Sequence, residues 1–152
     1  MKRGTIGREL TIGTIAGLAG GVAEVAWIWT YAAATNMDAA TVARAVTDTV
    51  GIGAQSPVAG GVATHMVLAA ILGIAVAFAL RPLRGIRLYA AMTSVLALVW
   101  AVNFLVVLPL VNPAFVDIVP MGVSFASKLL FGLAAAWSFQ LARSAEPALA
   151  RA

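Results

Sequence analysis

Four long apolar runs dominate the chain and are separated by short polar stretches. They extend roughly over residues 10–34, 58–80, 88–110 and 121–142. Each run is long enough for an α-helix to cross about 30 Å of hydrocarbon, which takes about 20 residues. Prolines mark the joins, at Pro57, Pro82, Pro109, Pro113 and Pro120. The pattern predicts an all-α polytopic membrane protein, a four-transmembrane-helix bundle that forms a single membrane domain over residues 1–152.

The loop after the first run predicts a short amphipathic helix over residues 39–49. Val42, Val46 and Val50 recur every four residues and place an apolar stripe on one helix face. The preceding segment Thr35-Asn36-Met37-Asp38 has the spacing of a capping box. We expect this helix to lie on the outer surface of the membrane.

Composition and charge placement agree with a membrane protein. The chain is 62% hydrophobic and 11% charged, with a mean hydropathy of +0.97, whereas soluble domains are about half apolar and a quarter charged. Basic residues gather on one side of the predicted bundle, namely Lys2, Arg3, Arg8, Arg81, Arg84, Arg87, Arg143 and Arg151. This bias predicts a multi-pass protein of the bacterial inner (cytoplasmic) membrane with both termini in the cytoplasm. The basic residues form no patch interleaved with aromatics, so we expect no nucleic acid partner.

Two expectations concern the predicted spans themselves. The first run begins like a secretory signal, but it carries Glu24 and continues through Trp29, so we expect a spanning helix. The turn at residues 81–85 is short, and we therefore expect the second and third spans to be neighbours. Ile28 and Val95 are expected to face lipid.

The spans contain few polar side chains, and four of them fall at one depth. Glu24, His65, Asn103 and Lys128 each lie 15 or 16 residues from a charge at the basic side. At 1.5 Å per residue this is about 22–24 Å, in the outer half of the membrane. Intramembrane ionisable residues usually pair, line a pathway or bind a ligand. We therefore predict a polar layer formed by these four residues.

Small residues on the same helix faces indicate that the layer points into the bundle. Close helix packing is predicted at Gly13, Gly17, Gly21, Gly61, Gly73 and Gly132. Trp27 lies one turn from Glu24, and Trp100 shares a face with Asn103, so both tryptophans are candidate ligand contacts.

The polar layer has more than one interpretation. It could bind or relay a proton, an ion or a small ligand, as in a transporter, channel or sensor. It could instead be a structural ion pair of Glu24 and Lys128 in an accessory subunit of a larger membrane complex, such as a respiratory or redox assembly. A third interpretation is a haem-ligating membrane subunit, in which haem is bound at His65, although a chain with one histidine and no cysteine favours no cofactor and no metal.

Catalytic motifs are missing from the sequence. There is no Ser/His/Asp arrangement, phosphate-binding loop or dinucleotide motif, and we expect no enzymatic activity. The expected partners are the lipid bilayer and either further copies of this chain in a homo-oligomer or the subunits of a larger complex.

Several short segments resemble one family of small bacterial membrane proteins. They are the run Gly61-Val62-Ala63-Thr64-His65 leading to Arg81-Pro82, the glycine-rich start of the first span, and Pro109 followed by Pro113-Ala114-Phe115. In these the chain is similar to the uncharacterised YagU-like family, and it departs from that pattern at Lys128. The resemblance implies a four-helix protein of the inner membrane and assigns no chemistry.

Overall fold

A computed structural model describes residues 3–51 and 56–144, and all regular structure in these residues is helical. The elements are α1 (Arg3–Thr35), α2 (Ala39–Val50), α3 (Pro57–Ala79), α4 (Gly85–Val102), the π-helix η1 (Asn103–Val107), α5 (Leu108–Val111), α6 (Pro113–Ile118) and α7 (Met121–Ser144). Four helical stretches are long and apolar enough to cross a membrane: Ile6–Thr35, Pro57–Ala79, Gly85–Val111 and Met121–Ser144. The predicted all-α bundle of four spans is confirmed.

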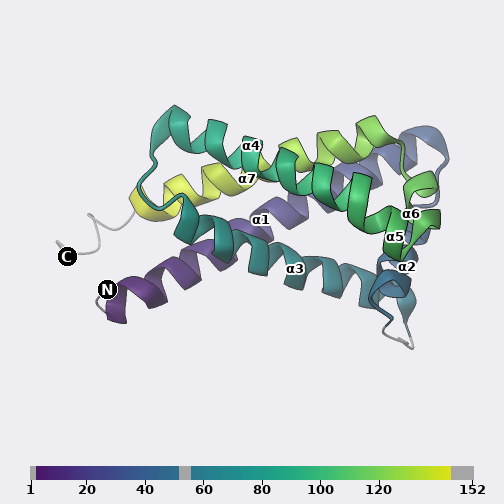
Figure 1. The fold of residues 1–152 in the computed structure, drawn as a ribbon, viewed down its shortest axis with the longest axis horizontal. Coiled ribbons are helices and arrows are strands. Elements are labelled where there is room, and N and C mark those ends of the chain that lie inside the picture. Colours follow the sequence, from purple (N-terminus) through teal and green to yellow (C-terminus); the bar gives the residue numbers. More distant parts are fainter. Residues whose placement is uncertain (1–2, 52–55, 145–152) are drawn as a thin grey trace.

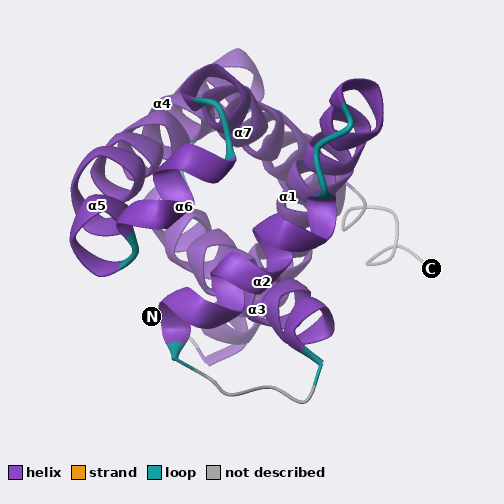
Figure 2. Ribbon diagram, turned by 90° about the vertical axis from the view of Figure 1, so that its right-hand side faces the viewer, coloured by secondary structure: helices purple, strands orange, loops and turns teal. Residues whose placement is uncertain are grey.

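The spans surround a common centre in the order α3, α1, α7, α4 (Figures 1 and 2). Helix α1 packs on both α3 and α7, and α4 packs on α7. One end of the bundle holds Arg8, Arg81 and Arg143 and is called the arginine end. At the opposite end, called the α2 end, helix α2 packs across the start of α3 and approaches α6.

The second and third spans, α3 and α4, are joined by the expected short turn but are not packing neighbours. Their extensive contacts are with other helices, α3 with α1 and α2, and α4 with α7. Glycine explains the choice of partner, because a Cβ on Gly73 would collide with the backbone of Gly13 and Gly17. On the other side, a Cβ on Gly132 would lie 3.0 Å from Thr93 Cα. Close approach at these glycines draws α3 toward α1 and α4 toward α7.

The remaining glycines of the predicted packing set divide between two partners. Gly21 faces Ala69 and Met66 of α3, as a continuation of the Gly13–Gly17 stripe. Gly61 faces the Ala43 backbone, so its missing side chain admits α2 and not another span. Gly20, which the sequence did not single out, makes room for the ring of Phe131.

The two halves of the bundle differ in how their centre is filled. Toward the arginine end, large side chains are fully buried and close the centre, namely Leu88, Met92, Leu96, Phe131 and Phe139. Toward the α2 end, the centre holds a cavity. The solid half and the hollow half meet at Phe131, which also lines the cavity.

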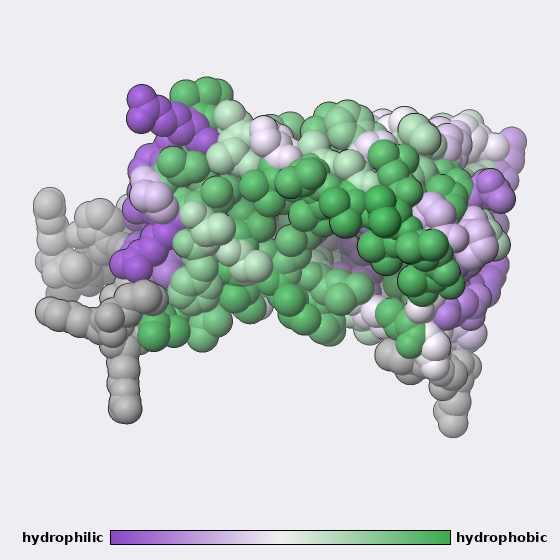
Figure 3. Space-filling view, in the orientation of Figure 1, coloured by the Kyte–Doolittle hydropathy of each residue, from purple (hydrophilic) through white to green (hydrophobic). Residues whose placement is uncertain are grey.

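The outer surface is a hydrophobic band between hydrophilic ends (Figure 3). Large exposed side chains such as Leu98 and Trp137 belong to this surface, as expected for helices in lipid. Two positions expected to face lipid are only partly exposed. Ile28 lines the central cavity, and Val95 packs against the buried core. In both cases a neighbouring helix packs on a helix face that the spacing of apolar residues in the sequence did not identify.

Candidate functional site

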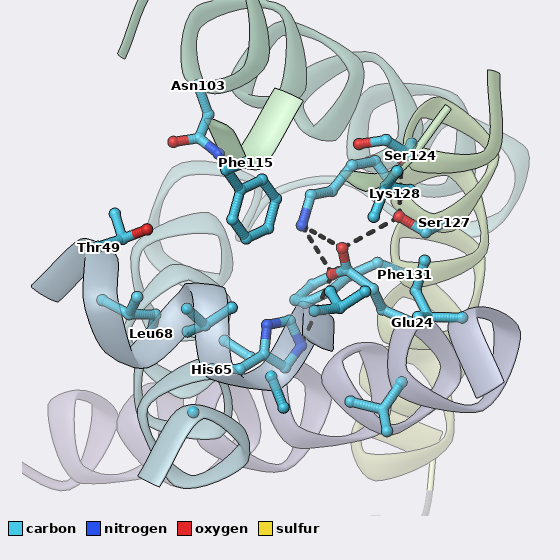
Figure 4. A pocket seen from close by; sticks show the side chains of 18 of the residues that line it. Glu24, Thr49, His65, Leu68, Asn103, Phe115, Ser124, Ser127, Lys128 and Phe131 are labelled. Carbon is cyan, nitrogen blue, oxygen red and sulfur yellow. Dashed lines mark hydrogen bonds and ion pairs between the residues drawn. The ribbon is translucent and has the colours of Figure 1, made fainter. Parts of the chain in front are cut away.

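An ion pair between α1 and α7 forms the centre of the candidate site (Figure 4). Lys128 Nζ lies 2.5 Å from Glu24 Oε1 and 2.7 Å from Glu24 Oε2, so the ammonium donates to both carboxylate oxygens. The side chains are only 11% and 17% exposed for Glu24 and Lys128 respectively. The structure thus brings together two of the four predicted polar residues, as a nearly buried pair.

Ser127 completes the surroundings of the Glu24 carboxylate. Its hydroxyl oxygen lies 3.0 Å from Glu24 Oε1 and 2.7 Å from the Ser124 carbonyl oxygen. The single hydroxyl proton is donated to one of these acceptors at a time. The sequence analysis did not identify Ser127. Serine is common on the packed faces of membrane helices, and only its position next to Lys128 indicates a role at the site.

His65 joins the pair from α3 without forming a hydrogen bond to it. Its Nε2 lies 3.8 Å from Glu24 Oε2, which is too long for a hydrogen bond. Nε2 is buried and has no hydrogen-bond partner. The third predicted residue is therefore at the site, and its ring nitrogen Nε2 has no hydrogen-bond partner there.

These three side chains lie beside a cavity of about 330 Å³. The walls come from all four spans, and most of the lining is apolar, for example Val25, Leu72 and Val99. Helices α2 and α6 cover the cavity at the α2 end, where Val46 and Phe115 enter the lining. A largely apolar cavity with a few convergent polar groups is the usual form of a small-molecule site.

Asn103 lines the same cavity but does not join the ion pair. Figure 4 shows it on the far side of the cavity, with the Phe115 ring between it and the Glu24–Lys128 pair. Asn103 begins the π-helix η1, where the backbone N–H of Leu108 bonds to the Asn103 carbonyl. Pro109 follows within one turn, and its ring cannot fit against a regular helical carbonyl four residues earlier. The wider π turn accommodates the proline, while Asn103 itself keeps regular helical geometry and its N–H bonds to the Val99 carbonyl. Asn103 therefore shares the cavity with the other three residues of the predicted layer but does not contact the ion pair.

The two candidate tryptophans separate in the structure. Trp100 lines the cavity, and its Nε1 donates to Ser124 Oγ at 3.0 Å while its ring stacks on Phe104. Trp27 does not line the cavity, and its Nε1 donates to the Val123 carbonyl at 3.0 Å. The tryptophan that α1 contributes to the lining is Trp29. Trp27 therefore ties α1 to α7 and is not placed as a ligand contact.

Helix α2 has the predicted apolar stripe, but the stripe faces the cavity. Val42, Val46 and Val50 all belong to the cavity lining. Thr47, which is buried, donates to the Pro57 carbonyl at 2.5 Å and holds α2 against the start of α3. The predicted short helix is present as α2, and its apolar stripe packs over the hollow centre of the bundle.

The capping residue of α2 also differs from expectation. Asp38 is the N-cap, and its carboxylate accepts from the Ala40 backbone N–H at 2.9 Å. The Thr41 hydroxyl, the Ala40 N–H and the Arg44 guanidinium stabilise the charged carboxylate and lower the pKa of Asp38. Thr35 instead donates to the Tyr31 carbonyl in α1. The capping-box spacing placed the cap three residues too early.

A second buried ion pair, which the sequence did not reveal, lies at the arginine end. Glu9 is only 1% exposed, and Glu9 Oε2 accepts from Arg143 Nη2 at 2.8 Å. Arg143 also donates to the Arg81 carbonyl and stacks on the Phe139 ring. The sequence alone does not reveal this pair, because Arg143 lies 134 residues after Glu9 in the chain.

Within residues 3–51 and 56–144, no three His, Asp or Glu side chains come together as a metal site. Comparisons of the chain with protein-family models, with curated proteins and with solved structures found no match. The candidate function is therefore argued from the cavity and its ion pair.

Proposed function

We propose that this membrane protein binds a small ligand in the cavity beside Glu24, His65 and Lys128. One observation carries the proposal: the nearly buried Glu24–Lys128 pair lies on the wall of a cavity of about 330 Å³ and not in a filled core. A pair that only fixed helix positions would need no cavity beside it. The hollow beside this pair supports binding.

The polar groups at the site retain unused hydrogen-bonding capacity. Lys128 has three N–H donors, and the Glu24 carboxylate oxygens take two of them. His65 Nε2 has no partner, and the Asn103 amide lies on the opposite wall. A bound molecule could therefore contact polar groups on two sides of the cavity while its apolar part meets the remaining lining.

The filled half of the bundle favours binding over ion conduction. A channel or proton pathway needs polar groups or water along its length. Between the cavity and the arginine end, the described centre is closed by side chains such as Leu96, Phe131 and Phe139. The proposal is therefore a receptor or carrier-like role, without a continuous pore and without a chemical reaction.

The placement of charge supports an orientation for this site. Arg8, Arg81 and Arg143 lie at the same end of the described bundle. Under the positive-inside rule this end faces the cytoplasm. The cavity would then lie in the outer half of a bacterial inner membrane.

A structural role for the polar layer is the second candidate. The observation that favours it is the completeness of the Glu24 contacts, because both carboxylate oxygens accept from Lys128 and one lies within reach of Ser127. In this alternative the pair fastens α1 to α7 in an accessory subunit of a larger membrane complex, and the cavity has no ligand of its own.

Native mass spectrometry of protein released from its own membranes separates the two candidates. We expect the wild type to retain a small-molecule adduct that is lost when Glu24→Gln and Lys128→Met are combined. The double substitution removes both charges together and should preserve the fold, which circular dichroism and size-exclusion chromatography would verify. The matched control is Arg44→Met, which breaks an exposed ion pair with Asp38 away from the cavity and should keep the adduct.

The absence of an adduct would contradict ligand binding. If the wild type carries no small-molecule adduct in mild detergent, and the folded double variant behaves identically, ligand binding at this site is contradicted. The structural candidate would then account for the pair.

A further inference from the structure

We infer that the ligand is a neutral amphiphile with a hydrogen-bond-accepting oxygen in its headgroup, and that it enters from the bilayer between α3 and α4. The inference rests on the proposed function of the cavity and adds the chemical class of its ligand and the route of entry. Three features of the described residues support it: the separation of two spans, the residues that border the cavity at both ends of the bundle, and the charge balance of the site.

The separation of α3 and α4 leaves a lateral opening. These consecutive spans pack on different partners, yet both contribute to the cavity lining. Leu68 of α3 lines the cavity while 54% exposed, and Asn103 on the other side is also exposed. In Figure 3 the hydrophobic face is hollowed between these helices, and hydrophilic atoms are visible at the bottom of the hollow. The polar site is therefore reached from the surface that faces hydrocarbon.

At both ends of the bundle, described residues lie between the cavity and the bundle end. Toward the α2 end, α2 and α6 cover the cavity, and Asn112 Nδ2 donates to Thr49 Oγ1 at 3.0 Å between them. Thr47 fastens the same helix to the Pro57 carbonyl. Toward the arginine end, Leu96 and Phe131 are buried in the filled core. These residues favour entry from the side of the bundle over entry from either end.

The charge balance of the site selects a neutral headgroup. Glu24 and Lys128 neutralise each other at 2.5–2.7 Å, so a charged ligand would bring an unpaired charge into an apolar cavity. The remaining Lys128 N–H donor fits a carbonyl, hydroxyl or ester oxygen. From the cost of an uncompensated charge in the membrane interior, we expect charged analogues to bind about 100-fold more weakly than neutral ones.

The cavity volume is consistent with a ligand that is only partly enclosed. Small-molecule sites span about 300–1,000 Å³, and this cavity of about 330 Å³ is near the lower limit. It can hold a headgroup and the first carbons of a chain. The rest of the chain would pass outward beside Leu68 and Leu72 into the lipid.

Photolabelling of the full chain in lipid nanodiscs tests the inference. The probes are three C16 amphiphiles with a diazirine near the headgroup: hexadecanol, hexadecanoate and hexadecyltrimethylammonium. We expect saturable labelling of cavity-lining residues of α3 and α4 by the alcohol alone, competed by unlabelled hexadecanol. Labelled positions would be identified by peptide mass spectrometry.

Two neighbouring positions of α3 provide a matched pair of variants. Leu68→Trp places a large ring at the opening, and we expect it to reduce saturable labelling by about tenfold or more, equivalent to about 1.4 kcal/mol. Val67→Trp introduces the same ring at a residue that is 58% exposed but does not line the cavity. Labelling of the Val67→Trp variant should equal that of the wild type.

Three outcomes would overturn the inference. They are equal labelling by a charged probe, full labelling of the Leu68→Trp variant, and no saturable labelling of the cavity by hexadecanol. Any of these, together with a native adduct that depends on Glu24 and Lys128, would leave the proposed binding function intact and reject only the neutral amphiphile and its lateral entry. Absence of the native adduct from the wild type would reject the binding function itself.

Discussion

Glu24→Gln is expected to destabilise the bundle far more than its small change in shape suggests. The substitution leaves the Lys128 ammonium in the membrane interior without the carboxylate that now accepts two of its N–H groups. Removing one partner of a buried ion pair lowers the free energy of unfolding by about 3–5 kcal/mol. Both side chains retain some exposure, 11% for Glu24 and 17% for Lys128, so the expected loss is at the lower end, about 3 kcal/mol.

Adding Lys128→Met should restore most of the lost stability. The double variant has no unpaired charge, and Met retains much of the apolar length of the lysine side chain. The amide oxygen that Glu24→Gln introduces could still accept from the Ser127 hydroxyl, which lies 3.0 Å from Glu24 Oε1 in the wild type. We expect the double variant to lie within about 1 kcal/mol of the wild type, which gives a coupling energy of about 2 kcal/mol or more between the two sites.

The assay is equilibrium unfolding in mixed micelles with increasing SDS, followed by circular dichroism, for the wild type, both single variants and the double variant. Arg44→Met serves as the control, because its ion pair with Asp38 is exposed and should contribute little. Single variants that are as stable as the wild type would refute the reasoning, since the pair would then be open to water. A double variant that loses as much as the two single variants together would do the same.

The remaining predictions concern packing, the cover of the cavity and orientation. Gly17→Ala should lower the free energy of unfolding by about 1–3 kcal/mol, because the new Cβ would collide with the Ala69 carbonyl. Gly7→Ala on the same helix places its Cβ where nothing lies within 4 Å, so this control should be neutral or stabilising. Equal losses of stability in the two variants would contradict the packing of α1 on α3. Asp38→Ala should speed hydrogen exchange in α2. Because the pKa of Asp38 is lowered in the folded protein, its stabilisation of α2 is present at neutral pH and is lost as the pH falls through the lowered value, so the wild type should approach the variant in acid and differ from it at pH 7. Reporter fusions after Arg84 should report the cytoplasm and fusions near Ala45 the outer side; a cytoplasmic Ala45 would reverse the proposed orientation.

The sequence predicted the spans and the meeting of three polar residues because membrane chemistry leaves few alternatives. A helix in lipid must satisfy its own backbone, so long apolar runs predict spans directly. Glu24, His65 and Lys128 are rare groups at one depth, and unpaired charges there are costly. The glycine stripe pointed to the correct face of α1, because a Cβ at Gly17 would meet the backbone of α3.

The parts that the sequence could not predict depend on contacts between distant segments. Asn103 was assigned to the layer by its depth along the span, and depth alone does not show that the Phe115 ring lies between it and the ion pair. Glu9 is buried by Arg143, which comes 134 residues later in the chain. The stripe on α2 was correct as a pattern, but a local pattern does not distinguish a membrane surface from a cavity.

An experimental structure determined in a lipid environment tests the central claim most directly, because it shows whether the cavity beside Lys128 holds a molecule. We predict density for a small non-water molecule in the cavity of about 330 Å³, with a polar atom within hydrogen-bond distance of Lys128 Nζ and an apolar part extending between α3 and α4. A cavity that is filled by its own side chains, or that is empty while Lys128 contacts only Glu24, would contradict the account.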